Sequence, residues 1–224
     1  MIEYVLIDLD GTLLDFSAGE RNAFKETIEK YSNYNLKEDD YKKFSDINEF
    51  YFNEYSKGNM LRKEFHYNRF KKIFEYLNLD CPIEEANAFY IESLRYQANP
   101  FDDVFEFLDY LKGKYRLFIA SNGMTSVQIK RLEISKMLNY FEKIFVSETI
   151  GFNKPDEGFF EYVLKDINDY DKSKYIIIGD RLDSDIEGGR RFDIKTVFLD
   201  RNKKHNDVNA NFHIFDLSEI KKIL

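Results

Sequence analysis

Short apolar runs alternate with helix-like segments after Pro100, and this alternation constrains the fold more than any other feature of the 224-residue sequence. The strand-like runs are apolar, include β-branched residues and are too short to be helices. They lie at 116–120, 143–146, 174–179 and 195–199. Helices are predicted around them at about 102–112, 127–132, from Pro155 onward, 184–192 and 216–223. Strands that alternate with helices indicate crossover connections and therefore a parallel sheet.

A further strand-like run, YVLIDL at residues 4–9, stands far from the others in the sequence. Because one strand is not stable alone, this run must join the same sheet. Between 17 and 97, apolar residues recur at the three- and four-residue spacing of amphipathic helices. These helical runs are Phe24, Ile28 and Tyr31; Phe65, Phe70, Ile73, Phe74 and Leu77; and Ala86, Phe89, Tyr90 and Leu94. We therefore predict an α/β core formed by 1–14 and 98–224, with an all-helical insertion at 15–97.

Charge and cysteine content exclude several classes of protein. Lys and Arg total 33 against 41 Asp and Glu, so the chain lacks the positive surface of a DNA- or RNA-binding protein. No uncharged apolar run reaches the roughly 18 residues of a membrane span, and early acidic residues argue against a secretory leader. The single cysteine, Cys81, is typical of a reducing compartment. We expect a cytoplasmic protein with no membrane or nucleic-acid partner, as a monomer or weak dimer.

Polar residues follow the predicted strands at the points where the strands end. Ligands bind outside the carboxyl ends of parallel strands, so these residues should meet at one edge of the sheet. They are Asp8 and Asp10, Ser121 and Asn122, Lys154, and Asp180 and Asp185. Taken singly, 121–123 could form an ordinary turn, Lys154 could be solvated, and Asp185 could cap a helix. Their convergence on one edge favours a functional site.

Asp8 and Asp10 stand two residues apart in an extended segment, which places their side chains about 6.6 Å apart along the strand. One carboxylate could attack a substrate while the other transfers a proton. Two anions this close repel each other unless a cation lies between them. Asp180 arrives from another strand end with a third carboxylate, and Mg²⁺ prefers such oxygen ligands. The metal would also attract an anionic substrate to an acidic protein.

Four strings at these strand ends resemble the motifs of the haloacid dehalogenase superfamily of hydrolases. DLDGTL at 8–13 matches the first motif, SNG at 121–123 the second, Lys154 with Pro155 the third, and GDRLDSD at 179–185 the fourth. The resemblance covers essentially the whole chain. It implies a three-layer, Rossmann-like core, and it identifies the helical insertion at 15–97 with the small cap domain that one subgroup carries.

The same resemblance implies a role for each residue at the strand ends. Asp8 would be the nucleophile that forms a phospho-aspartyl intermediate, and Asp10 would be the general acid and then the general base. Asp8, the backbone carbonyl of Asp10 and Asp180 would bind Mg²⁺, with Asp185 supporting through water. Ser121 and the backbone N–H of Asn122 would hold the phosphate, and Lys154 would offset its charge. Asp10 favours phosphate esters, because the dehalogenases proper lack this second acid.

Looser strings resemble the pyrimidine 5′-nucleotidases, namely 15–24, 57–70 and 147–163. This similarity implies that the substrate is a small phosphorylated metabolite, a pyrimidine nucleoside 5′-monophosphate. Arg62, His66 and Arg69 share one face of a predicted helix, which would either contact the substrate or be solvated. Phe16 would stack on a base or pack in the core. Phosphoglycolate and sugar-phosphate phosphatases, a β-phosphoglucomutase-like mutase and a non-catalytic binding protein remain alternatives.

Overall fold

The computed structural model describes residues 1–224, which divide into two compact units. The sheet unit comprises Met1–Asp15 and Asn99–Leu224, and the helical unit comprises Phe16–Ala98. Both junctions lie one residue further along the chain than the sequence predicts. None of the helices combines the length and the apolar character that crossing a membrane requires.

Six strands form one sheet in the order β3-β2-β1-β4-β5-β6, and every neighbouring pair is parallel. They are β1 Tyr4–Ile7, β2 Arg116–Ser121, β3 Lys143–Val146, β4 Tyr175–Gly179, β5 Lys195–Leu199 and β6 Phe212–Ile214. The predicted α/β fold with a parallel sheet is confirmed. Strand β6 was not predicted, because three residues with a central histidine are too short to show a strand pattern.

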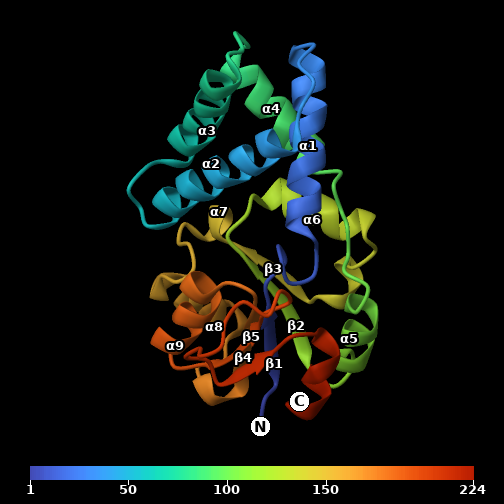
Figure 1. The fold of residues 1–224 in the computed structure, drawn as a ribbon. Helices are drawn as coiled ribbons and strands as arrows, with labels where there is room; N and C mark the ends of the chain where they lie inside the picture. Colours follow the sequence, from blue (N-terminus) through green and yellow to red (C-terminus); the bar gives the residue numbers. More distant parts are fainter. The chain divides into compact units, whose positions relative to one another are not determined.

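Helices cover both faces of the sheet, so the sheet unit has three layers (Figure 1). Its helices are α5 Val104–Leu111, α6 Thr125–Ile134, α7 Ser147–Ile150, α8 Glu157–Ile167 and α9 Glu187–Arg191. Short turns are η1 Leu138–Tyr140, η2 Lys172–Lys174, η3 Leu182–Ile186 and η4 Leu217–Lys222. Alternate residues of β1 serve opposite faces: Val5 and Ile7 pack with α5, and Tyr4 and Leu6 pack with α8. Burial on both faces explains why the strands read as continuous apolar runs.

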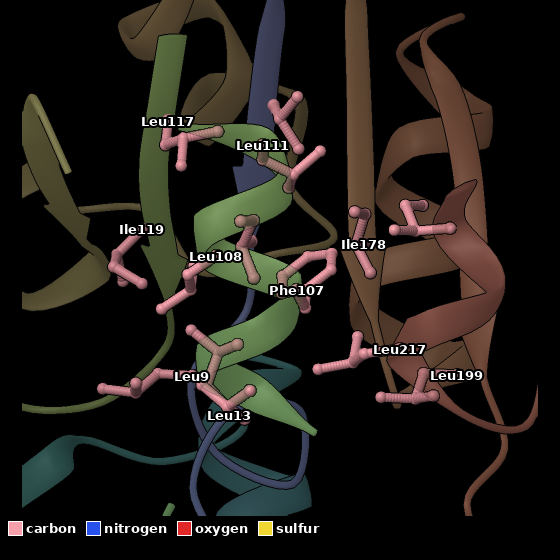
Figure 2. Close-up of a cluster of buried hydrophobic side chains, with 14 of the residues drawn as sticks. Leu9, Leu13, Phe107, Leu108, Leu111, Leu117, Ile119, Ile178, Leu199 and Leu217 are labelled. Carbon is pink, nitrogen blue, oxygen red and sulfur yellow. The ribbon is translucent and has the colours of Figure 1, made fainter. Parts of the chain in front are cut away.

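The layer that contains α5 shows how the sheet is covered (Figure 2). Phe107, Leu108 and Leu111 of α5 pack with Leu117 and Ile119 of β2, and all five are buried. Ile178, Leu199 and Leu217 continue the same cluster toward the C-terminus. Removing this apolar surface from water holds the strands in position, and so fixes where their carboxyl ends lie.

Two helix boundaries differ from the predicted ones. The helix expected from Pro155 begins at Glu157, because the Asp156 side chain caps it by accepting a hydrogen bond from the Gly158 N–H, 2.8 Å away. Pro155 therefore lies in the preceding loop. The helix expected at 184–192 consists of a π-helical turn, η3, followed by the short α9.

The helical unit contains four helices: α1 Phe16–Tyr31, α2 Glu38–Ser56, α3 Arg62–Leu77 and α4 Ile83–Leu94. Their core is rich in aromatic residues, and the rings of Phe24 and Phe44 stack with centroids 4.0 Å apart. The three predicted apolar runs fall on α1, α3 and α4. Helix α2 contributes Phe44 and Ile47 to this core from a stretch in which the sequence analysis singled out no run.

Arg69 lies in the core of the helical unit, so of the two alternatives for its helix face, solvation is wrong for this residue. Its side chain is buried and donates to Asn48 Oδ1 at 2.9 Å and to Asn87 Oδ1 at 2.8 Å. Asn48 in turn donates to Glu20 Oε1 at 2.6 Å. Spacing along a helix places a residue on a face, but it does not say whether that face is covered.

His66 lies 3.2 Å from Arg69, measured between Nδ1 and Nη2. Arginine only donates, so Nδ1 must accept, and an imidazolium could not do so. Burial, followed by the charges of Arg69 and Arg62, lowers the pKa of His66 to about 3. The ring therefore stays neutral in the folded protein at pH values where the unfolded chain binds a proton.

We expect the helical unit to lose stability as the pH falls below about 6.5, the ordinary pKa of histidine. The folded-state pKa of His66 is depressed, so its contribution is complete above that pH and declines by about 1.4 kcal/mol per pH unit below it. Urea unfolding of the protein and of His66→Asn between pH 7.5 and 5 tests this. The difference in unfolding free energy between the unmodified protein and His66→Asn should shrink toward low pH. A difference that does not change with pH would contradict the prediction.

Candidate active site

The candidate active site lies at the carboxyl ends of the three neighbouring strands β2, β1 and β4. Asp8 follows β1, Ser121 ends β2 and Asp180 follows β4. Parallel pairing puts these ends at one edge of the sheet, as predicted from the residues that follow each strand. Lys154 joins them from the loop between α7 and α8.

Lys154 links two carboxylates at the centre of the site. Its ammonium donates to Asp8 Oδ1 at 2.8 Å, to Asp185 Oδ1 at 2.5 Å and to the backbone carbonyl of Ala120. Only 1% of the Lys154 side chain is exposed. All three ammonium protons therefore have acceptors, which a buried charge requires.

The charges in this cluster shift pKa values in opposite directions. Burial alone would favour the neutral amine, but ion pairs with Asp185 and Asp8 raise the pKa of Lys154 above its ordinary value. Burial raises the pKa of Asp8 well above its ordinary value, and the negative charges of Asp185 and Asp180 add to this, while Lys154 opposes them. The three carboxylates thus carry more negative charge than the one ammonium of Lys154 can balance.

Asp180 lies beside the loop that follows β1. Thr12 donates from Oγ1 to Asp180 Oδ1 at 3.0 Å. Gly11 has φ of +87°, and a Cβ there would lie 2.2 Å from Asp180 Oδ2, so only glycine fits. Burial and the charge of Asp185 raise the pKa of Asp180 to about 7.

Carboxylate oxygens of Asp8, Asp180 and Asp185 all lie within 4.8 Å of one another. Three carboxylates this close, two of them with raised pKa values, fit a divalent cation that takes oxygen ligands. The cluster includes the side chain of Asp185, which the sequence analysis placed at one water's distance from the metal. Asp10 is expected to contribute only its backbone carbonyl, and its side chain lies outside this cluster.

The second strand end contributes Ser121 and Asn122. Asn122 holds the backbone of Lys154 from both sides: its Nδ2 donates to the Lys154 carbonyl, and its Oδ1 accepts from the Lys154 N–H, each at 2.8 Å. The Ser121 hydroxyl is buried and accepts from the Gly123 N–H at 3.1 Å. The SNG string therefore fixes the position of the lysine as well as lining the site.

Asp10 faces a different set of partners from Asp8. Gln128 Nε2 donates to Asp10 Oδ2 at 2.6 Å, and Arg131 forms an ion pair with Asp10 Oδ1. Both partners lie on α6, and both are buried. Neither residue was predicted from the sequence. The available signal was two polar residues three apart, on one face of the helix that follows the SNG string.

The three residues expected to contact substrate from the insertion all lie in the helical unit. Phe16 begins α1 and is half-buried. Arg62 begins α3 and donates to the Tyr55 hydroxyl at 2.6 Å. Arg69 is held in the buried network described above. A contact between any of them and a substrate stays a prediction.

Comparison with known proteins finds similarities that extend along nearly the whole chain. The family model described as "Haloacid dehalogenase-like hydrolase" matches residues 5–199. The HAD-hydrolase YfnB of Bacillus subtilis is 30% identical over 98% of this chain and 94% of its own length. The pyrimidine 5′-nucleotidase PynA of Streptococcus pneumoniae is 27% identical over 97% of this chain and 93% of its own. A crystal structure of YfnB bound to magnesium covers 100% of this chain and 98% of its own, with a TM-score of 0.93 and 30% identity.

Proposed function

Because the chain belongs to the haloacid dehalogenase-like hydrolase family, we propose that it is a magnesium-dependent phosphatase that hydrolyses a small phosphate monoester. The observation that carries this proposal is the cluster of Asp8, Asp180 and Asp185, in which Asp8 and Asp185 pair with the buried ammonium of Lys154. It combines a nucleophilic carboxylate with positive charge and a place for a divalent cation, as phosphoryl transfer requires.

Hydrolysis proceeds in two steps at Asp8. A carboxylate oxygen of Asp8 attacks phosphorus, the ester P–O bond breaks, and Asp10 gives its proton to the departing alkoxide. Asp10 then takes a proton from water, whose oxygen attacks phosphorus. The bond between phosphorus and Asp8 breaks, inorganic phosphate leaves, and the free carboxylate returns. Ser121 and the Asn122 N–H hold the phosphate oxygens, and Lys154 offsets their charge.

The residues present fit Mg²⁺. Asp8, Asp180 and the carbonyl of Asp10 would hold the ion, with Asp185 next to them. When bound, it supplies positive charge that stabilises the transferring phosphoryl group. Asp180 has to give up its proton to act as a ligand, and its pKa of about 7 makes ionisation easy near neutral pH.

The proposed substrate is a pyrimidine nucleoside 5′-monophosphate. The similarity to PynA along nearly the whole chain supports this class. The helical unit would act as the cap that selects the substrate, with Phe16 and Arg62 as candidate contacts, whereas the guanidinium of Arg69 is held in the buried network with Asn48 and Asn87. Two further properties of the protein stay predictions. One is its location in the cytoplasm, which the free thiol of Cys81 supports, and the other is its state as a monomer or weak dimer.

Removing the metal should reduce hydrolysis of 4-nitrophenyl phosphate by about 100-fold or more, because the transition state loses several kcal/mol of charge stabilisation. The measurement is the rate after chelation and after titration with Mg²⁺. Asp180→Asn should require more Mg²⁺ for half-maximal rate. Asp183→Asn is the matched control, since Asp183 pairs with Arg181 outside the cluster. Hydrolysis that is indifferent to chelation would contradict the proposed function.

A panel of phosphate esters then tests the substrate class. Dephosphorylation of UMP, dUMP or dTMP should exceed that of phosphoglycolate and hexose phosphates. The reverse order would favour a phosphoglycolate or sugar-phosphate phosphatase. An isomerised sugar phosphate without release of inorganic phosphate would favour a phosphomutase. A protein that neither binds Mg²⁺ nor turns over any ester would favour the non-catalytic alternative.

A further inference from the structure

Helix α6 places two buried polar side chains against Asp10. Arg131 is 0% exposed and Gln128 is 1% exposed, although neither lies in a motif used above. Burying a guanidinium is costly unless it is paired, and its partner here is the Asp10 carboxylate. A quarter of the Asp10 side chain stays exposed. This leaves the carboxyl group accessible to a substrate while α6 holds it from behind.

The two side chains engage both oxygens of Asp10. Gln128 Nε2 donates to Oδ2 at 2.6 Å, and Arg131 Nη1 pairs with Oδ1. The same amide also donates to Ser121 Oγ at 2.8 Å, and Gln128 Oε1 accepts from Arg131 Nη1 at 3.1 Å. One side chain therefore contacts the proposed proton donor and the proposed phosphate-binding hydroxyl together.

Gly123 makes room for this amide. A Cβ at residue 123 would lie 2.3 Å from Gln128 Nε2 and 2.8 Å from its Cδ, which is too close for any real contact. The end of Gln128 is held by two short hydrogen bonds, so it could not move aside without releasing Asp10 or Ser121. The glycine of the SNG string thus accommodates a specific polar contact.

We propose that Gln128 and Arg131 are positioning residues that hold the Asp10 carboxyl group at a fixed place relative to the phosphate bound at Ser121. This inference rests on the proposed function, in which Asp10 protonates the leaving group. A displaced Asp10 would hinder departure of a poor leaving group, whereas a stable anion leaves without protonation. Metal binding by Asp8 and Asp180 would be unaffected.

The test compares kcat/KM for two aryl phosphates, because this parameter reports the step in which the leaving group departs. Phenyl phosphate has a more basic leaving group than 4-nitrophenyl phosphate. Gln128→Met and Arg131→Met should raise the preference for 4-nitrophenyl phosphate by about 10-fold or more. Asp10→Asn sets the upper limit of this change in preference. Arg131→Lys, which keeps the charge, should change the preference less than Arg131→Met.

Arg116→Met is the matched control, because Arg116 pairs with Glu142 at the surface of the same unit and lies on β2, away from Asp10. It should leave the preference unchanged, and Mg²⁺ affinity should be the same in all the folded variants. If Arg131→Met fails to fold, Gln128→Met decides. The inference would be overturned if Gln128→Met and Arg131→Met lost kcat/KM equally on both aryl phosphates while Asp10→Asn lost it selectively on phenyl phosphate. Absence of hydrolysis by the unmodified protein would instead overturn the proposed function.

Discussion

Replacing Asp8 by asparagine should lower kcat/KM for an aryl phosphate by about 10⁴-fold or more. The amide keeps the size of the side chain but cannot attack phosphorus, so no covalent intermediate forms. The unmodified protein, quenched during turnover, should carry one phosphoryl group on the peptide that contains Asp8. Asp8→Asn should carry none, which rapid-quench mass spectrometry would detect.

The control for this change is Asp166→Asn, which alters charge by the same amount. Asp166 pairs with Lys143 at the surface of the sheet unit, away from the strand ends. The activity of Asp166→Asn should stay within about twofold of that of the unmodified protein, because substitutions at such surface positions usually have small effects. Substantial turnover by Asp8→Asn would rule out Asp8 as the nucleophile.

Replacing Lys154 by methionine should destabilise the protein by about 3–5 kcal/mol in the absence of metal. The change removes the charge that Asp8 and Asp185 share and leaves two buried carboxylates without compensation. It should also lower kcat by about 100-fold or more, since a positive charge aimed at the phosphate is lost. Urea unfolding with and without Mg²⁺, together with a phosphatase assay, measures both effects.

Mg²⁺ should recover part of the stability of Lys154→Met, because the cation binds the same carboxylates. Lys143→Met is the matched control. Lys143 is 46% exposed and pairs with Asp166, so its removal should cost at most about 1 kcal/mol. Equal destabilisation by the two variants would mean that the buried ion pairs around Lys154 do not stabilise the fold.

The strand ends could be predicted from the sequence because parallel strands impose a simple geometry. An apolar run such as YVLI identifies a buried strand, and the residue that follows it must lie at the edge of the sheet. This places Asp8, Ser121 and Asp180 without knowledge of any distance. Local pattern is sufficient here, since the topology brings the strand ends together.

Other features depend on what packs against a helix, which local pattern does not show. Gln128 and Arg131 look like ordinary surface residues of a helix, yet both are buried against Asp10. Arg69 shares a helix face with Arg62, but only Arg69 lies in a core. The burial of a polar residue depends on a partner distant in sequence, such as Asn48 for Arg69. The short β6 and the capping of α8 by Asp156 depend similarly on neighbours.

The central place of β1 in the sheet has a consequence for synthesis. Tyr4 pairs with Arg116 and with Tyr175, so β1 leaves the ribosome long before either of its partner strands. The helical unit, whose contacts lie within Phe16–Ala98, is complete before either partner strand exists. We expect the helices to form during translation and β1, which precedes Asp8, to take its central place only after β2 and β4 have emerged. A nascent chain stalled before residue 175 should therefore remain inactive.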